Sequence, residues 1–221
     1  MNTTYSTHAL MEYLPTRYTA TPQQQADRNE VYRFKDGNCS TRVLDGLVSE
    51  INKITGTNKD RYLICFIPAS TAAKTRTRFQ QLAANLRNRT GCNVSLTGIH
   101  NAYDRESAIV TGKTDNPTAS FCVNDDEVRG KKIILIDDVI TRGRSFNGSA
   151  AKLMAAGATS VEGLFVAKTI NPDYISHGCG YDFEPDYFNE DEFDPMDYDE
   201  CYEPDPEDFY DEPDPSDYYG F

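Results

Sequence analysis

Metal-binding and disulfide patterns are missing from this chain of 221 residues. Its six cysteines include no CxxC pair, and its three histidines, His8, His100 and His177, stand apart from other ligating residues. This spacing argues against a zinc site and a disulfide framework, and is typical of buried thiols in a reducing compartment. A Gly-x-x-x-x-Gly-Lys-Ser/Thr loop is also missing, which argues against a nucleotide triphosphatase.

Long apolar runs are missing as well. No stretch approaches the roughly 20 apolar residues that cross a bilayer. The first residues also lack the basic and apolar regions of a secretory signal. We therefore expect a cytoplasmic protein that has no membrane partner.

Positive charge is missing from the C-terminal part of the chain. Residues 171–221 hold 19 Asp and Glu and no Lys or Arg, whereas residues 1–170 hold all 22 Lys and Arg against 16 Asp and Glu. The basic body suits a phosphorylated ligand or nucleic acid. Its short basic cluster, Arg129 with Lys131 and Lys132, is more typical of a solvated strand entry, so nucleic acid is the less favoured partner.

Repeated prolines and acidic residues predict that 171–221 is a disordered acidic tail that also contains aromatic residues. Two interpretations of this tail stay open. It is either a solubilising extension, or a segment whose acids and 13 aromatic residues mimic nucleic acid or occupy the basic ligand site of the body.

Hydrophobic periodicity predicts alternating helices and strands in the body, and no element before about Arg28. Helical spacing follows an N-cap at Ser40 and ends at Gly56, and it recurs over 73–89 and 146–156. Apolar runs of strand length cover 62–67, 94–99, 132–136 and 161–167. This alternation predicts an α/β fold with a central, mainly parallel sheet flanked by helices. The expected domains are an N-terminal hood or extension (1–38), the core (39–170) and the tail (171–221).

One predicted strand runs directly into two carboxylates. The segment Ile133–Ser145 reads IILIDDVITRGRS and places Asp137 and Asp138 at a strand end, before a short loop and a helix. Ligands of open α/β sheets bind at such ends. The loop offers N–H groups, hydroxyls and a helix N-terminus to a phosphate, while the carboxylates accept hydrogen bonds from sugar hydroxyls. A sugar phosphate suits both halves, although an acid pair that only solvates the loop stays open on these residues alone.

The whole string resembles the motif for 5-phosphoribosyl-1-pyrophosphate (PRPP) in type I phosphoribosyltransferases, four apolar residues followed by DDVxTxGxS. This resemblance implies that Asp137 and Asp138 bind the ribose hydroxyls. It also implies that the 5-phosphate is cupped by the loop residues Thr141, Arg142, Gly143, Arg144 and Ser145. The arginines at 142 and 144 depart from many members, and either strengthen phosphate binding or reach a second anionic group.

Two further segments resemble other parts of this family. The segment 66–71 is similar to its pyrophosphate loop, which implies pyrophosphate binding by Ala69, Ser70, Thr71 and Lys74. The residues Arg78-Phe79-Gln80 resemble a stretch of competence protein F (ComF)-like members, although such cations also form the solvated face of a helix. The segment 103–121 stands where the family has its flexible catalytic loop, which implies that Arg105 and Lys113 stabilise the leaving pyrophosphate. The resemblance further implies Mg²⁺ bound with PRPP, and a homodimer.

The threonine at position 141 argues against 6-oxopurine bases as the acceptor. In 6-oxopurine phosphoribosyltransferases an aspartate at this position is the general base, and threonine cannot replace it near neutral pH. The sequence is closer to the orotate, amidophosphoribosyltransferase and ComF-like groups. We predict a phosphoribosyltransferase that transfers the phosphoribosyl group of Mg-PRPP to an unidentified nitrogen acceptor and releases pyrophosphate. The alternative is a non-catalytic PRPP-binding protein of ComF type, regulatory or accessory to DNA uptake or processing.

Overall fold

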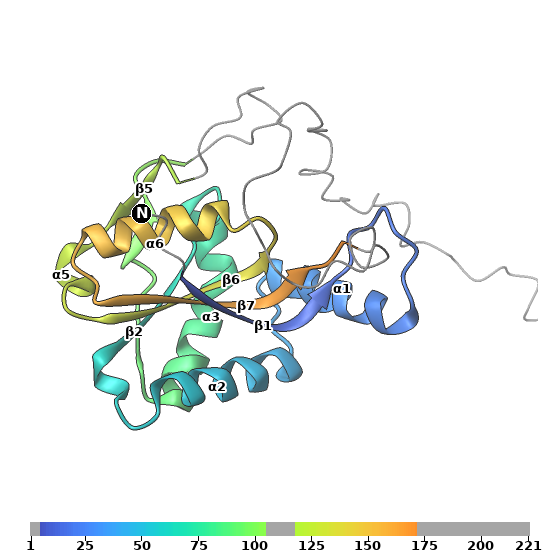
Figure 1. The fold of residues 1–221 in the computed structure, drawn as a ribbon, viewed down its shortest axis with the longest axis horizontal. Coiled ribbons are helices and arrows are strands. Elements are labelled where there is room, and N and C mark those ends of the chain that lie inside the picture. The colour runs from blue at the N-terminus through green and yellow to red at the C-terminus, as the bar shows by residue number, and fades with distance from the viewer. Residues whose placement is uncertain (1–4, 105–117, 172–221) are drawn as a thin grey trace, which may run out of the picture. The chain divides into compact units, whose positions relative to one another are not determined.

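The computed structural model describes residues 5–104 and 118–171, and its centre is a five-stranded parallel sheet (Figure 1). The strands lie in the order β1-β7-β6-β2-β3, and each neighbouring pair runs parallel. Their bounds are Ser6–Tyr13 for β1, Ser160–Thr169 for β7, Lys132–Ile140 for β6, Tyr62–Phe66 for β2 and Asn93–Val94 for β3. The predicted α/β fold with a central parallel sheet is confirmed.

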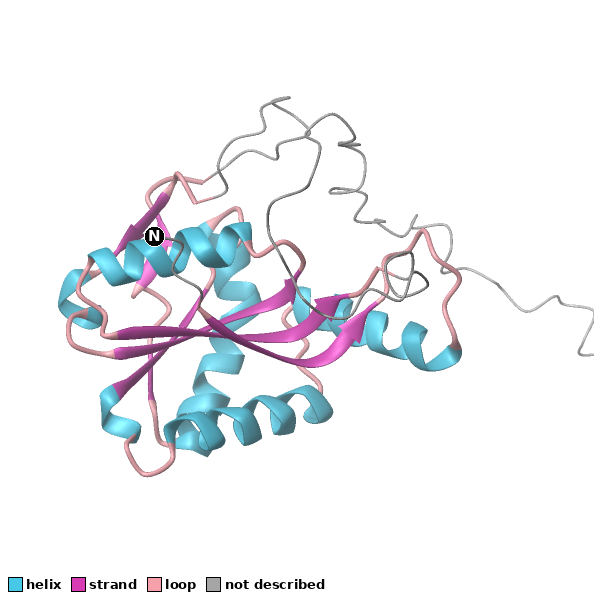
Figure 2. Cartoon of the chain, viewed as in Figure 1, coloured by secondary structure: helices cyan, strands magenta, loops and turns pink. Residues whose placement is uncertain are grey.

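Helices cover both faces of this sheet (Figure 2). Helix α6 (Arg144–Ala155) lies on one face, and the other face carries α1 (Pro22–Lys35), α2 (Thr41–Thr55) and α3 (Ala72–Thr90). The side chains of β6 alternate between them. Ile134 and Ile136 join the core with α1, α2 and α3, whereas Ile133 and Leu135 pack with α6. Because all four are at most 1% exposed, β6 is buried on both faces, as expected of a central parallel strand.

The predicted ends of α2 are confirmed, and α3 is capped by residues of the same kinds. Ser40 caps α2 by accepting a hydrogen bond from the N–H of Val43, and Gly56 ends the helix. Thr71 caps α3 in the same way, and Gly91 closes it with a φ of 73°. Glycine adopts this left-handed conformation at little cost, which makes it the preferred residue at such an end.

The N-terminal segment contains two elements, β1 and α1, that the sequence did not predict. Strand β1 forms an edge of the main sheet. Arg28 of α1 is only 5% exposed and donates hydrogen bonds to the carbonyl oxygens of Leu14, Pro15 and Tyr18. One buried arginine therefore holds the connection between β1 and α1, a contact that hydrophobic periodicity cannot indicate.

The predicted strand over 94–99 is wrong. The hydroxyl of Ser95 accepts hydrogen bonds from the N–H groups of Thr97 and Gly98, which turns the chain after β3. The chain then forms β4 (Ile99–Asn101), which pairs antiparallel with β5 (Phe121–Val123) in a second sheet. Serine competes with the strand ladder through such local bonds. The short helices η1 (Lys59–Arg61) and α5 (Asp125–Val128) complete the described elements.

The described part of the chain includes four cysteines, all free thiols, of which Cys65 and Cys92 are buried. In residues 5–104 and 118–171, no helix combines the length and the apolar character needed to cross a membrane. Apart from Asn171, the predicted acidic tail lies outside the described residues.

Candidate functional site

The two predicted acids lie at the carboxyl end of β6, between its neighbours β7 and β2. Successive side chains of a strand point to opposite faces. Asp138 therefore follows Ile136 toward α1 and α3, and Asp137 follows Leu135 toward the α6 face. Asp138 is 7% exposed, and Asp137 keeps 16% of its side chain exposed.

Arg78 of α3 reaches both acids. Its Nη1 lies 3.2 Å from Oδ2 of Asp138 and 3.9 Å from Oδ1 of Asp137. Its Nε donates a hydrogen bond to the carbonyl oxygen of Lys35, at 3.2 Å. The resemblance at Arg78-Phe79-Gln80 does not indicate this contact, because it joins residues that lie far apart in the chain.

Backbone N–H groups donate hydrogen bonds to one oxygen of each carboxylate of the acid pair. Oδ1 of Asp137 accepts the N–H of Asp138 at 2.9 Å, and Oδ1 of Asp138 accepts the N–H of Val139 at 2.6 Å. Since Oδ2 of Asp138 accepts a hydrogen bond from Arg78, both of its oxygens have partners. Among the residues that the structure describes, Oδ2 of Asp137 receives no hydrogen bond. This oxygen is the open acceptor of the pair.

The charge of the acid pair is set by its surroundings. Burial and the adjacent Asp138 carboxylate raise the pKa of Asp137 to about 8, against the opposing influence of Arg78, the N–H of Asp138 and Lys35. Two carboxylates side by side disfavour simultaneous ionisation. A ligand that donates hydrogen bonds to Asp137 would favour its ionised form and release its proton.

The loop after β6 presents an open helix N-terminus. Gly143 is the N-cap of α6, has a φ of 67°, and provides no side chain to cap the helix. The first N–H groups of a helix have no acceptor within it, so those of α6 are oriented to bind an anion. Arg142 and Arg144 are exposed on either side of Gly143, and Ser145 is half-buried.

Thr141 links this loop to the end of β7. Its hydroxyl oxygen lies 2.7 Å from that of Thr169. This bond ties the start of the predicted phosphate loop to the neighbouring strand, so the loop leaves the sheet in a defined direction.

The loop after β2 is fixed by its own polar groups. The N–H of Ala69 donates to the hydroxyl of Thr75, at 3.0 Å. The carbonyl oxygen of Ala69 accepts a hydrogen bond from the side-chain amide of Asn101, at 2.5 Å. The predicted pyrophosphate loop is therefore anchored both to α3 and to β4.

An acidic side chain lies at the start of α3. The carboxylate of Asp104 accepts the N–H of Ala72 at 2.8 Å, and Thr71 caps the N–H of Lys74 at 3.0 Å. A carboxylate is stabilised at a helix N-terminus for the same reason as a phosphate. The end of α3 that the resemblance assigns to pyrophosphate thus already holds a negative group of the chain itself.

Most of the predicted site residues meet at one edge of the sheet. Strands β2 and β6 are neighbours, with Phe66 opposite Ile136, and the N–H of Ile67 donates to the carbonyl oxygen of Ile136. The loop after β2, with Ala69, Ser70 and Thr71, therefore lies beside the acid pair, and Lys74 is exposed on the first turn of α3. The predicted catalytic residues Arg105 and Lys113 lie outside the described residues.

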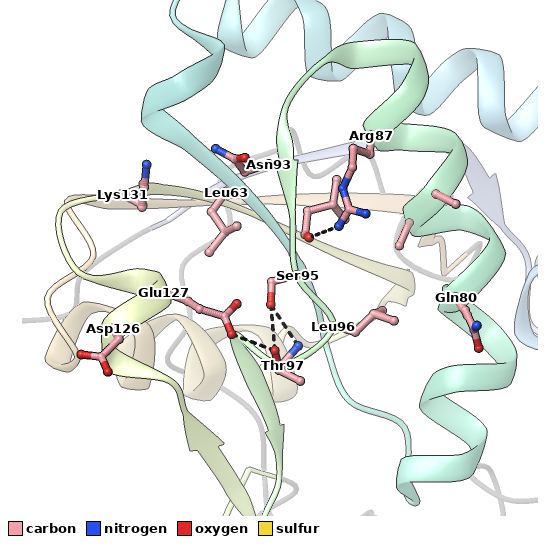
Figure 3. Close-up of a pocket in the computed structure, with 13 residues that line it drawn as sticks. Leu63, Gln80, Arg87, Asn93, Ser95, Leu96, Thr97, Asp126, Glu127 and Lys131 are labelled. Atoms are coloured by element: carbon pink, nitrogen blue, oxygen red, sulfur yellow. Dashed lines mark hydrogen bonds between the residues drawn. The ribbon is translucent and has the colours of Figure 1, made fainter.

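A separate depression lies beside the edge strand β3 (Figure 3). It is lined by parts of α3, the turn after β3 and α5, and none of the predicted site residues lines it. Its polar groups bond to one another: Arg87 donates to the carbonyl oxygen of Val94, and Thr97 donates to Glu127. We therefore place the candidate site at the carboxyl end of β6 rather than in this depression.

No group of three or more His, Cys, Asp and Glu side chains able to hold a metal ion occurs within the described part of the chain. The acid pair consists of two carboxylates that already contact an arginine.

Comparison with known proteins gives structural matches. No protein-family model and no curated protein matches this chain. A solved adenine phosphoribosyltransferase matches with a TM-score of 0.40 and 14% identity, over 63% of this chain and 74% of the other. The chain is similar to phosphoribosyltransferases. The enzyme from Saccharomyces cerevisiae, complexed with adenine and an imino-altritol bisphosphate, matches with a TM-score of 0.38 and 15% identity, over 62% and 73% of the two chains.

An allosteric regulatory enzyme of purine biosynthesis also matches, with a TM-score of 0.36 and 18% identity. The match covers 56% of this chain but only 25% of that enzyme. Matches at these identities and TM-scores show a similar fold, and the function is inferred from the residues of the site.

Proposed function

We propose that this chain is a type I phosphoribosyltransferase that binds Mg-PRPP at the carboxyl end of β6 and transfers the phosphoribosyl group to a nitrogen acceptor. The observation that carries the proposal is the convergence of three features at one edge: the acid pair, the open N-terminus of α6 and the loop after β2. This arrangement suits a ligand with a sugar diol between two anionic groups, which is the chemistry of PRPP.

Each feature has a distinct role in this proposal. The 5-phosphate lies at the N-terminus of α6, where N–H groups and the arginines at 142 and 144 supply positive charge. The ribose hydroxyls donate hydrogen bonds to the acid pair. The acceptor nitrogen forms a bond to C1 of the sugar while the bond from C1 to pyrophosphate breaks, so the protein acts mainly by positioning and by neutralising charge.

Mg²⁺ would be held mainly by oxygens of the pyrophosphate and ribose, with few protein ligands, and would neutralise the leaving group. The chain's own share is to hold the sugar in place. The acid pair fixes the diol and the N-terminus of α6 fixes the phosphate at the other end, which leaves C1 with little freedom to turn.

The acceptor side is proposed to be formed by residues 1–38. Strand β1 ends at Tyr13, whose hydroxyl lies 3.3 Å from that of Tyr32 on α1. Burial and the Tyr32 hydroxyl raise the pKa of Tyr13, and the charge of Asp138 adds to the shift. This pair of tyrosine hydroxyls offers hydrogen bonds and aromatic surface to an acceptor.

A PRPP-binding protein without turnover is the second candidate, and one contact favours it. The Asp104 carboxylate occupies an N–H group at the start of α3, so the pyrophosphate of a bound ligand would compete with it. Binding of Mg-PRPP without release of pyrophosphate would identify this second function.

The test is pyrophosphate release from Mg-PRPP with pooled nitrogen acceptors: nucleobases, orotate, ammonia and glutamine. The acid-pair variant Asp137→Asn/Asp138→Asn is expected to lose activity by roughly 100-fold or more. The matched control is Asp125→Asn/Asp126→Asn, which changes two adjacent exposed aspartates on α5 and should retain activity. Equal rates in the wild type and the acid-pair variant would overturn the transferase function.

A further inference from the structure

Arg78 differs from the other arginines of α3 in what surrounds it. Only 18% of its side chain is exposed, against 42% for Arg89 near the other end of the helix, which pairs with Asp45. Its guanidinium lies over the Phe79 ring, 5.7 Å from the centroid. A cation held between an aromatic face and two carboxylates has little freedom to turn.

The backbone around Arg78 is also held closely. Its Nε donates to the carbonyl oxygen of Lys35, the last residue of α1. Just beyond, Gly37 has a φ of 84°, and a Cβ at this position would lie 2.4 Å from the carbonyl oxygen of Thr77. The end of α1 and the second turn of α3 therefore approach so closely that only glycine fits between them. Arg78 is anchored from both helices before it reaches the acids.

The two carboxylates lie at different distances from this arginine. Oδ2 of Asp138 lies within hydrogen-bond distance of Nη1, at 3.2 Å, whereas Oδ1 of Asp137 lies beyond it, at 3.9 Å. With Val139 bonded to its other oxygen, Asp138 is directed on both sides by the chain itself. Asp137 keeps Oδ2 for a ligand.

We infer that Arg78 is the positioning residue of the acid pair, which fixes Asp138 in place and leaves Asp137 as the carboxylate that accepts hydrogen bonds from the sugar hydroxyls. This inference rests on the proposed function and deepens it, since it assigns different tasks to two adjacent aspartates. Asp138 with Arg78 forms the rigid support, and Asp137 is the direct contact.

The contact between Arg78 and the acid pair should make ligand binding depend on pH. Among the described residues, the charged groups that face Asp137 are Asp138 on its own strand, Arg78 from α3 and Lys35 from α1. The titratable hydroxyl of Tyr13, from β1, faces Asp138. Of the groups that lower the pKa of Asp137, Arg78 has the largest effect. Loss of its charge would raise that pKa further, so ionised Asp137 would be reached only at higher pH.

The experiment measures binding of ribose 5-phosphate and of inorganic phosphate by calorimetry between pH 6 and 9. The variants are Arg78→Gln and Arg78→Lys, with Arg89→Gln as the matched control, which removes a paired arginine from the same helix. We expect Arg78→Gln to weaken ribose 5-phosphate roughly 10- to 100-fold at pH 7 and to shift the binding profile to higher pH. Inorganic phosphate, which lacks the hydroxyls, should bind all proteins equally.

The lysine variant separates charge from geometry. Arg78→Lys should restore the position of the pH profile but not the full affinity, because lysine supplies the charge without the planar fork. A folding role alone would weaken inorganic phosphate and ribose 5-phosphate alike at every pH, and that result would overturn the inference.

The failures of the two proposals are distinguishable. If the wild type binds ribose 5-phosphate and Arg78→Gln binds it equally well with the same profile, only the role of Arg78 falls. If neither the wild type nor Arg89→Gln binds a sugar phosphate, the proposed function falls and the inference falls with it. Thermal melting of each variant establishes that it is folded.

Discussion

The two helices that begin at the carboxyl edge of the sheet, α3 and α6, start in opposite ways. At α3, Thr71 caps the helix and Asp104 accepts a further N–H group. At α6, the N-cap is Gly143, which provides no side chain to cap the helix. The acids differ in the same way: Asp138, toward α3, is paired with Arg78, whereas Asp137, toward α6, keeps an open oxygen.

This difference indicates that the α3 side of the site mainly holds the structure in place, whereas the α6 side is open to a ligand. Polar groups that are satisfied within the chain stabilise it, and a ligand can use them only by exchange. Groups left open gain their partners from water or from a ligand. We therefore expect substitutions on the α3 side to reduce stability most, and substitutions on the α6 side to reduce binding most.

Breaking the α3 side at Asp138 should have the largest effect on stability. Asp138→Ala leaves Arg78 without its partner, and the N–H of Val139 without its acceptor. We expect a loss of about 2–3 kcal/mol, below the cost for a fully buried pair because Arg78 is partly exposed. Urea unfolding measures the loss. Asp45→Ala, which breaks the exposed pair with Arg89, should cost no more than about 1 kcal/mol, and equal costs would contradict the comparison.

On the α6 side, Asp137 should make the free energy of unfolding depend on pH. The pKa of Asp137 is raised from 3.8 to about 8 in the folded protein, so between these values the folded state keeps a proton that the unfolded chain has released. The free energy of unfolding should therefore fall as pH rises through this window. Asp137→Asn should flatten that fall, as measured by urea unfolding at pH 5, 6, 7 and 8. An unchanged slope would show that another group carries it.

Caps of the two helices provide a smaller, paired test. Gly143→Ala forces a Cβ into a left-handed conformation, at a cost of about 1–2 kcal/mol, and should weaken binding of inorganic phosphate several-fold. Thr71→Ala removes the cap of α3, at a cost of about 1 kcal/mol, and should weaken phosphate binding less than Gly143→Ala does, because Asp104 already occupies that helix end. Calorimetry with both variants would contradict the comparison if Thr71→Ala were the one that lost phosphate.

The smallest effect is expected when the negative charge at the N-terminus of α3 is removed. Asp104→Asn removes the charge at the helix N-terminus, so pyrophosphate should bind roughly two- to five-fold more tightly. Asp126→Asn, an exposed aspartate on α5, is the control for the change in net charge. Equal affinity in both variants would show that Asp104 does not compete with the ligand.

Local signals account for the elements that the sequence predicted correctly. The apolar run of β6, the N-cap Ser40 and the end of α2 at Gly56 each act within a few residues, so they could be recognised without the fold. The acid pair could be placed at a strand end for the same reason.

Long-range polar contacts account for what the sequence did not predict. Arg28 bonds the carbonyl oxygens that join β1 to α1, and Arg78 bonds Asp138 across 60 positions of the chain. Neither arginine lies in an amphipathic or capping pattern that indicates its partner. At Ser95 the sequence predicted a strand that does not form, because the Ser95 hydroxyl bonds local N–H groups and turns the chain.

The pairing of β1 with β7 constrains the order of folding. Within the described sheet, β1 is bonded only to β7, with Ser6 opposite Glu162, so almost the whole body must be synthesised before β1 can dock. Closing such a long loop is slow compared with local helix formation. A nascent chain will therefore carry an undocked N-terminal segment until β7 leaves the ribosome, and a chaperone that binds this segment would act during that interval.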